Sequence, residues 1–540
     1  MISSIKKQSG FIISGSIALV TLAPVLFILV SGFYAESDIW IHLRQYVLPD
    51  LLKNTAVLIA GVIFTTAVLG ISLAWLTSFH EFRGRRLFEK LLLFPLAIPA
   101  YVMAFIYTGL FDFSGPIQTG IRSHFPVLAG YFPEIRSSWG VIMVISLSIF
   151  PYVFLMASQG FRSMGKSMVE ASQSLGSGRF FTLFRVTIPM AKPWIFGGLI
   201  LVFMETLADF GAVSVFNYDT FTTGVYKAWY GFFSINAASQ LASILVVIVL
   251  VIFSAESYFR RKQQFFNKGN HQPMVRNPLS GGGSVLAIGY CSLVFFMAFV
   301  IPVGQLVIWA KGVFQIEMSS HYFRLLANTF LLGIMGMGFT MAVAVVLAYS
   351  GRTMNDIKTG IAAKLSLAGY ALPGTVLAVG IINVVAQLDK VFSDLLNLAG
   401  FQVSSGVLNG SLLLLPFCYM VRFLTAGYNP VFSNMTRITA SMDEAATLMK
   451  VSGLTLLSKI HLPLIRRGIM TGSILVLVEI IKEMPVTLML RPFGWDTLAV
   501  KIFELTSEGE WERAALPAIT LVVAGMVPIL FLSIVGRKRY

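Results

Sequence analysis

Four carboxylic acids lie within two long apolar stretches of the sequence, where an ionisable side chain is costly. Glu205 and Asp209 are four residues apart in the first stretch. The second stretch repeats this spacing with Glu479 and Glu483, and Lys482 lies beside them. Residues four apart share one face of a helix, and ionisable groups inside a membrane span are candidates for function. One hypothesis is that the acids line or gate a cation path. The alternative is a structural role, through internal pairing such as Glu479 with Lys482, or at an interface.

The other side chains that could do chemistry do not form a recognisable site. The histidines are scattered and lack metal-ligand spacing, so no metal site is assigned. Residues 160–167 fit the phosphate-loop pattern G-x-x-x-x-G-K-[ST], but such a loop follows a buried β-strand. Here the preceding run, 141–156, contains Pro151 and is predicted to span a membrane. We therefore expect no catalytic residue, no nucleotide site and no cofactor in this chain.

The composition is that of a polytopic membrane protein. Hydrophobic residues make up 56% of the 540 residues and charged residues only 12%, about half the share of a soluble domain. Cys291 and Cys418 both fall in apolar stretches, so no disulfide framework is predicted. The net charge of +15 is typical of basic cytoplasmic loops. We expect no nucleic-acid partner, because no basic cluster stands apart from the apolar stretches.

Twelve apolar windows, six in each half, predict about twelve transmembrane helices in an all-α fold. The windows are 11–33, 55–79, 91–111, 139–160, 193–216, 238–258, 285–310, 326–350, 365–387, 404–421, 468–487 and 514–535. With the N-terminus in the cytoplasm, alternation puts 28 of the 40 Lys and Arg residues on the cytoplasmic side. This asymmetry predicts that both termini are cytoplasmic. The first window is expected to be retained as a span rather than cleaved.

The two halves are predicted to be a parallel six-helix repeat with an offset of 274 residues. Leu51-Leu52-Lys53-Asn54-Thr55 corresponds to Leu325-Leu326-Ala327-Asn328-Thr329 at this offset, and Ala97-Ile98-Pro99 to Ala371-Leu372-Pro373. An even number of spans per half gives both halves the same orientation. We therefore predict a first domain over 1–262, a cytoplasmic linker over 263–284 and a second domain over 285–540.

A polar segment between spans occurs once in each half, and each copy runs from a glutamate to a proline. The segments are EASQSLGSGRFFTLFRVTIP, residues 170–189, and EAATLMKVSGLTLLSKIHLP, residues 444–463. Glutamate suits the start of a helix, glycine permits a sharp bend, and proline suits the first turn of the next helix. Each segment is thus predicted to be a short helix, a bend and a return to the membrane. One copy could be an ordinary connection, but two matched copies favour a docking surface.

These two segments resemble the EAA loop of binding-protein-dependent ABC transporter permeases. The first copy matches at Glu170, Ala171, Gly176 and Pro189, with Ser172, Val186 and Ile188 as departures. The second copy has Lys450 where the family has glycine, so Gly453 is its nearest bend; it matches at Glu444, Ala445, Ala446, Ile460, Leu462 and Pro463. The resemblance implies a fusion of two permease domains in which each loop docks a cytoplasmic ATPase subunit.

Outward segments that are aromatic and polar, 217–230 and 491–501, follow the membrane acids. They could form an aromatic belt at the membrane interface, or dock a periplasmic binding protein. The runs 204–211, 219–221, 482–487 and 490–493 resemble fused permeases of ferric iron importers, while thiamine permeases have a similar length and layout.

The sequence therefore predicts the permease subunit of an ABC importer in the bacterial inner membrane, not an enzyme. The resemblance implies Fe³⁺ as the solute, with thiamine or another small solute as the alternative. It also implies two ATPase subunits, a periplasmic binding protein and membrane lipid as partners. The rival class is a secondary transporter driven by an ion gradient, which would suit the membrane acids but has no need for paired ATPase-docking loops.

Overall fold

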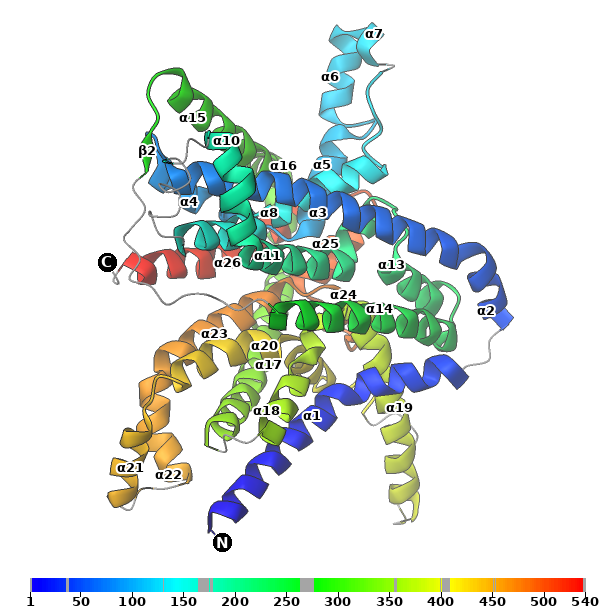
Figure 1. Ribbon diagram of the computed structural model, residues 1–540. Helices are drawn as coiled ribbons and strands as arrows, with labels where there is room; N and C mark the ends of the chain where they lie inside the picture. Colours follow the sequence, from blue (N-terminus) through cyan, green and yellow to red (C-terminus); the bar gives the residue numbers. More distant parts are fainter. Residues whose placement is uncertain are drawn as a thin grey trace. The chain divides into compact units, whose positions relative to one another are not determined.

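The computed structural model describes residues 2–34, 38–129, 131–163, 174, 178–262, 276–353, 357–398, 400, 408–449, 451 and 453–537. These residues are almost entirely helical (Figure 1). The main helices are α1 (Ile2–Tyr34), α2 (Asp38–His42), α3 (Leu48–Phe79), α4 (Arg85–Leu91), α5 (Ala100–Phe111), α6 (Pro116–His124), α7 (Pro126–Ala129), α8 (Ser138–Ser163), α10 (Arg179–Thr182), α11 (Ile188–Ala208), α12 (Gly211–Val215), α13 (Phe221–Tyr226), α14 (Ile235–Lys262), α15 (Gly282–Phe295), α16 (Ile301–Glu317), α17 (Ser320–Thr353), α18 (Ile357–Ser366), α19 (Gly374–Leu398), α20 (Leu414–Met435), α21 (Ala440–Leu448), α22 (Leu454–Leu456), α23 (Leu462–Lys482), α24 (Pro485–Leu490), α25 (Leu498–Ser507) and α26 (Trp511–Arg537).

Short irregular elements connect these helices. Two strands, β1 (His80–Glu81) and β2 (Asn277–Pro278), pair in parallel. Turns of 3₁₀-helix occur at Phe94–Ala97 and Ala368–Ala371, directly before the prolines of the repeated Ala-Ile-Pro and Ala-Leu-Pro motifs. Turns of π-helix occur at Leu43–Val47, Leu183–Thr187, Lys227–Gly231, Phe296–Val300 and Leu457–His461.

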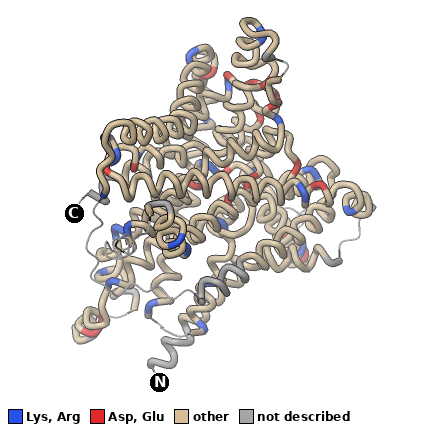
Figure 2. Tube along the Cα trace, turned by 45° about the horizontal axis from the view of Figure 1, so that its top comes forward, with Lys and Arg blue, Asp and Glu red and all other residues tan. Residues whose placement is uncertain are grey.

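Nine helices in the described part of the chain are long and apolar enough to cross a membrane. A bent pair, Arg85–Ala97 with Ala100–His124, turns by 89° at its break and raises the number to ten. Together these cover ten of the twelve predicted windows. The other two windows correspond to α20 and α23, which are helical but less apolar: α20 contains Arg422, and α23 contains Arg466, Arg467, Glu479 and Lys482. Figure 2 shows that most of the helical length is uncharged, so this is an all-α polytopic membrane protein.

The chain packs as two compact units, and each unit combines segments from both halves of the sequence. The first unit contains residues 1–42, 224–249 and 318–501. Within it α17, α20 and α23 pack together, and α1 packs against α17, α18 and α19. Ser14 Oγ of α1 lies 2.7 Å from Ser350 Oγ of α17, both buried. The first helix of the chain is thus part of a unit built mainly from the second half.

The second unit contains residues 43–223, 250–317 and 502–540. Here α3, α8 and α11 pack together, while α16 packs against α26 and α5. Tyr290 of α15 and Ser72 of α3 share a hydrogen bond of 2.7 Å. Helices α15, α16 and α26 therefore complete a unit built mainly from the first half. These units are defined by packing, whereas the predicted domains were defined by the sequence repeat. The packing therefore does not test the domain bounds 1–262, 263–284 and 285–540, which stay a prediction.

Close helix approach in the second unit depends on Gly70 of α3. A Cβ atom at this position would lie 2.6 Å from the Val153 Cβ and 2.9 Å from the Phe154 backbone nitrogen, both on α8. Small residues let membrane helices approach in this way, because packing rather than hydrophobicity holds them together in lipid. The contact between α3 and α8 therefore tolerates only hydrogen at this position.

We expect Gly70→Ala to destabilise the protein by about 1–3 kcal/mol, the usual cost of overpacking. Alanine gains about 1 kcal/mol of helix propensity over glycine, but the clash with α8 outweighs this gain. Gly338→Ala on α17 is the matched control, because a Cβ there meets no atom within 4 Å. Thermal unfolding of the detergent-purified protein should show a lower midpoint for Gly70→Ala only. Equal midpoints for the two variants would contradict the close approach.

Candidate functional site

The second Glu-Ala segment follows the path predicted from its sequence. Helix α21 carries Glu444 and Ala445 exposed and Ala446 buried. The chain then bends at Gly453, whose φ of 61° lies in the left-handed region that favours glycine. After α22, Pro463 lies in the first turn of α23. The segment is thus a short helix, a bend and a return, with its glutamate open to a partner.

The beginning of the first segment, with its Glu-Ala motif, lies outside the described residues. This holds for Glu170, Ala171, Ser172 and Gly176. Its last residue, Pro189, lies in the first turn of α11, as Pro463 does in α23. The docking role of both segments therefore stays a prediction from sequence.

The second segment is joined to the membrane helices by a cluster of three ionisable side chains. Arg352, in the last turn of α17, places its NH2 nitrogen 2.7 Å from Asp443 Oδ2 and 3.0 Å from the Ile438 carbonyl oxygen. His461 Nε2 lies 2.8 Å from Asp443 Oδ1 and 3.2 Å from the Arg352 NH1 nitrogen. Asp443 directly precedes Glu444 on α21. The cluster therefore connects the exposed glutamate's helix to both α17 and the start of α23.

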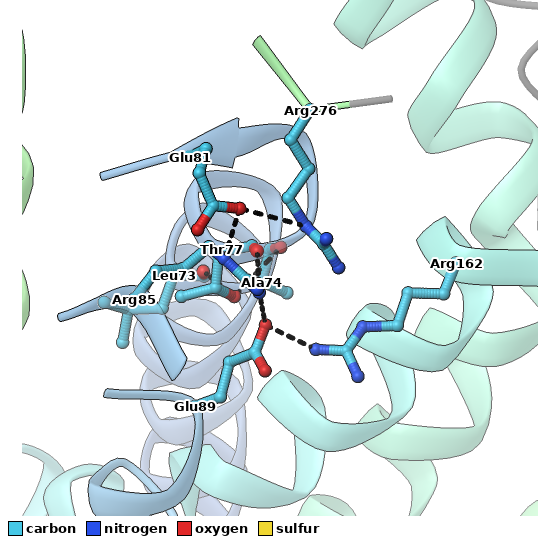
Figure 3. Close-up of polar contacts among 8 residues, drawn as sticks. All are labelled: Leu73, Ala74, Thr77, Glu81, Arg85, Glu89, Arg162 and Arg276. Carbon is cyan, nitrogen blue, oxygen red and sulfur yellow. Dashed lines mark hydrogen bonds and ion pairs between the residues drawn. The ribbon is translucent and has the colours of Figure 1, made fainter. Parts of the chain in front are cut away.

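A different cluster lies where α8 leads into the first segment (Figure 3). Its centre is Arg85, which is 3% exposed and pairs with Glu81 at 2.9 Å and with Glu89. Arg162, near the end of α8, pairs with Glu89 at 2.7 Å. Arg276 is the first described residue after position 262 in the predicted linker. It lies 3.9 Å from Glu81, beside the β1–β2 pair. The cluster thus joins the α3–α4 turn to the end of α8 through Glu89, and to the segment that leads into the second half through Glu81.

The Arg85 cluster has an excess of positive charge, with three arginines and two glutamates. Partial burial lowers the pKa of the Arg276 guanidinium, and the Arg85 charge lowers it further, while Glu89 and Glu81 oppose this effect. The two carboxylates compensate part of this positive charge, and so reduce the free-energy cost of placing three arginines together near the membrane.

The membrane acids lie at two helix breaks. Helix α11 ends at Ala208 and α23 at Lys482, and both Asp209 and Glu483 have extended backbones. Asp209 Oδ1 accepts a hydrogen bond from the Val213 N–H at 3.1 Å. Glu483 Oε1 accepts one from the Val486 N–H at 3.0 Å. Each carboxylate therefore caps the short helix that follows the break, α12 or α24.

The second acid of each pair lies directly after the last helical residue, so each pair marks the end of a helix instead of lying within one continuous helix. The two pairs differ in exposure: Glu205 and Asp209 are both half-buried, whereas Glu479 is exposed and Glu483 is only 6% exposed. Among the described residues there is no group of three metal-binding side chains.

The second break contains a buried ion pair that the sequence did not suggest. Arg422 Nε lies 3.2 Å from Glu483 Oε2, with the two side chains 15% and 5% exposed. Because the predicted window 404–421 ends just before Arg422, the sequence predicted a cytoplasmic loop at this residue. Arg422 instead lies inside α20, which begins at Leu414 and continues to Met435. At the offset of 274 residues the first half has Ser148 at this position. The only available signal was a lone arginine bordering an apolar window.

The outward segments are fixed to the repeated Leu-Leu-x-Asn-Thr motifs. Asn54 donates from Nδ2 to the Asp219 carbonyl oxygen at 3.0 Å, and Asn328 does so to Asp496 at 3.2 Å. The hydroxyl oxygens of the adjacent threonines, Thr55 and Thr329, accept backbone N–H bonds from Phe221 and Leu498 at 3.3 and 2.9 Å. The predicted repeat is thus confirmed at these positions in three dimensions.

Burial limits what these outward segments can contact. Phe221, Thr222 and Val225 are at most 1% exposed, and Leu498, Ala499 and Val500 are fully buried. Those parts form neither an aromatic belt nor a docking surface. Phe493 and Tyr230 are exposed, so only the flanks of the segments can meet lipid or a partner.

Comparison with known proteins places these features in a family. Residues 66–262 match the family described as "Binding-protein-dependent transport system inner membrane component". The chain is 25% identical over 492 residues to the Fe(3+)-transport system permease protein FbpB 2 of Haemophilus influenzae, covering 90% of each chain. Residues 66–262 belong to this family of transport-system permease components. The resemblance inferred from the Glu-Ala segments is thereby confirmed.

Two further relatives of the permease differ in how much of it they cover. The ferric transport system permease protein FbpB of Actinobacillus pleuropneumoniae is 22% identical over 586 aligned positions, 99% of the permease and 80% of the relative. The molybdenum transport system permease protein ModB of Haemophilus influenzae is 26% identical over 210 residues, 37% of the permease and 89% of the relative. The alignments with the ferric relatives thus extend over both halves of the permease, whereas the alignment with the molybdenum relative is about as long as one half.

Proposed function

We propose that the permease imports Fe³⁺ handed over by a periplasmic binding protein, driven by ATP hydrolysis in a separate subunit. One observation carries the choice of solute: similarity to a ferric permease extends over 90% of both chains, whereas similarity to the molybdenum permease covers 37% of this chain. Thiamine or another small solute is the alternative. In this proposal the chain has no cofactor and does no covalent chemistry; it stabilises inward-open and outward-open states to different degrees.

Two copies of the ATPase would dock, one on each Glu-Ala segment. The exposed Glu444 and Ala445 on α21, with Ala446, Gly453 and Pro463 shaping the path, support this role for the second segment. By the sequence repeat, Glu170, Ala171, Ser172, Gly176 and Pro189 have the same role in the first. ATP binding would draw the two ATPase subunits together and move both segments, and the permease would rock about a central path.

The orientation in the inner membrane, with both termini cytoplasmic, rests on the distribution of Lys and Arg. Contacts within the second unit support it, because segments assigned to one side meet one another. Arg162 and Arg276, both assigned to the cytoplasmic side, join the Arg85 cluster. Arg136, assigned to the outer side, pairs with Asp112 at 3.2 Å and donates to the Val215 carbonyl oxygen at 3.0 Å.

For the path itself, the four membrane acids divide into two roles. Glu205 and Glu479, which lie within α11 and α23 rather than at the helix breaks, are the residues that would meet the cation. Asp209 and Glu483 would act indirectly, by capping α12 and α24 and so fixing the helix breaks. A helix break in a membrane is stable where its free backbone groups find such partners.

Uptake of radiolabelled Fe³⁺ tests this proposal in cells that express the permease together with a partner ATPase and a periplasmic binding protein. Cells without the permease give the background, and excess unlabelled thiamine, molybdate or Fe³⁺ serves as competitor. Uptake that only unlabelled Fe³⁺ reduces is the expected result. ATPase capture without iron uptake would retain the transporter class and reject the solute. Failure to capture any ATPase would favour a carrier driven by an ion gradient.

A further inference from the structure

The second Glu-Ala segment is joined to a membrane helix mainly through one side chain. The Arg352 guanidinium contacts Asp443 on α21, the Ile438 and Thr439 carbonyl oxygens that precede α21, and His461 at the start of α23. Arg352 itself is the last-turn residue of α17. Three elements of the first unit therefore meet at one guanidinium, whose five N–H donors in a fixed plane suit several acceptors at once.

Burial makes this contact stiff. The His461 side chain is fully buried, that of Arg352 is 12% exposed and that of Asp443 is 31% exposed. The Tyr349 hydroxyl, one turn earlier on α17, adds a bond of 3.3 Å to the Gly453 carbonyl oxygen at the bend of the segment. The segment is thus fixed to α17 both at its helix and at its bend. A charge-assisted contact shielded from water is screened little by salt.

The first half is built differently at the corresponding positions. At the offset of 274 residues, Arg352 corresponds to Ser78, His461 to Thr187 and Tyr349 to Trp75. None of these can form the same ionic contacts. In the first half the ionic contacts lie instead at Arg85, Glu89 and Arg162. The ionic contacts that join the second segment to α17 therefore have no equivalent at the matched positions of the first half.

We propose that Arg352 is the positioning residue through which the second Glu-Ala segment moves α17, with Asp443 and His461 completing the link. This rests on the proposed function, because the segment moves only if an ATPase binds it. Glu444 and Ala445 would make the contact with the ATPase, and Arg352 would pass the displacement on. Loss of Arg352 should leave docking intact and break the transmission.

The link can be tested first in the permease alone. A nitroxide spin label on Met442→Cys reports the mobility of α21, because Met442 is 47% exposed and both native cysteines are fully buried. Arg352→Met should raise the mobility of the label. Arg324→Met, an exposed arginine near the other end of the same helix, is the matched control and should not. Unchanged mobility in Arg352→Met would overturn the proposal, whether or not an ATPase binds.

The second measurement uses the complex with the ATPase and the loaded binding protein. Arg352→Met should retain ATPase capture at the wild-type level, yet lose about tenfold in the stimulation of ATP hydrolysis by loaded binding protein, within the usual range of coupling between distant sites. Asp443→Asn should show a smaller loss, because its amide oxygen still accepts from Arg352. Arg352→Lys should lie between wild type and Arg352→Met, since a point charge cannot replace the planar fork.

The outcomes separate this link from the proposed function. Loss of ATPase capture in parallel with stimulation would make Arg352 part of the docking surface and overturn the proposal. Wild-type stimulation in Arg352→Met would also overturn it. If the wild-type permease captures no ATPase, the proposed function fails, and the label measurement still decides whether Arg352 fixes α21 to α17. Matching amounts of folded protein in Arg352→Met and Arg352→Lys exclude misfolding as the cause.

Discussion

Reversing both loop glutamates, with Glu170→Arg and Glu444→Arg in one chain, should abolish ATPase capture and solute uptake together. Glu444 is exposed on α21, and Glu170 is its counterpart in the repeat. A reversed charge at the centre of an interface costs about 2–4 kcal/mol, which is a loss of about 30- to 1000-fold in affinity at each segment. Because two ATPase subunits that associate with each other bind with avidity, each single reversal should cost less than the double reversal.

The measurement is pull-down of a co-expressed ATPase alongside uptake. The matched control is Glu134→Arg with Glu508→Arg, which makes the same change in net charge at two exposed glutamates predicted to face outward. It should leave ATPase capture unchanged. Equal capture by the double reversal and the control would remove both segments as docking sites. Loss of capture in only one single reversal would mean that one segment dominates binding.

The sequence predicted the repeat better than it predicted the packing. Matched motifs at one offset identified Asn54 and Asn328, and the structure gives both the same hydrogen bond to an outward segment. Such local contacts repeat because the helices of the second and fifth windows pack against each other in each half: α3 against α11, and α17 against α23. The apolar pattern of a helix does not predict which unit the helix joins. Hence α1 packs against α17 to α19, although nothing in residues 11–33 distinguishes this from packing against the first half.

The helix breaks at Asp209 and Glu483 were not predicted from the sequence, for a related reason. The windows 193–216 and 468–487 are largely apolar, with the four acids and Lys482 as their charged residues, so a long helix was the simplest prediction. The acids themselves stabilise the breaks, since Asp209 and Glu483 accept N–H bonds that a continuous helix would give to its carbonyl groups. Likewise, Arg352 and His461 are 109 residues apart, and only the fold brings them within 3.2 Å. Sequence reasoning found the exposed Glu-Ala positions but not the buried residues that hold them.

The buried ion pair at the second break leads to the largest expected loss of stability. Arg422→Met should destabilise the protein by about 3–5 kcal/mol, because removing one partner leaves the other charge buried without compensation. The remaining group is Glu483, whose side chain is 5% exposed and 3.2 Å from Arg422. Space at this site is also limited: a Cβ at Gly374 would lie 2.6 Å from the Arg422 NH1 nitrogen and 2.9 Å from Glu483 Oε1. The carboxylate therefore cannot easily turn toward water.

Adding Glu483→Gln to Arg422→Met should restore much of the loss. The glutamine keeps an amide oxygen that can accept the Val486 N–H bond, now made by Glu483 at 3.0 Å, and it removes the buried charge. Arg466→Met is the control, because Arg466 is exposed on α23 and surface charges contribute little. Midpoints of thermal unfolding in detergent for the wild type, both single variants and the double variant form a double-mutant cycle.

The two possible results of this cycle have different meanings for the break. A strong interaction between Arg422 and Glu483 would mean that the second break depends on an ion pair that the first, with Ser148 in place of the arginine, lacks. The second break would then be held by a contact that the first does not have. If Arg422→Met instead unfolds at the same temperature as Arg466→Met, the pair contributes nothing, and the cap on α24 is sufficient to hold the break.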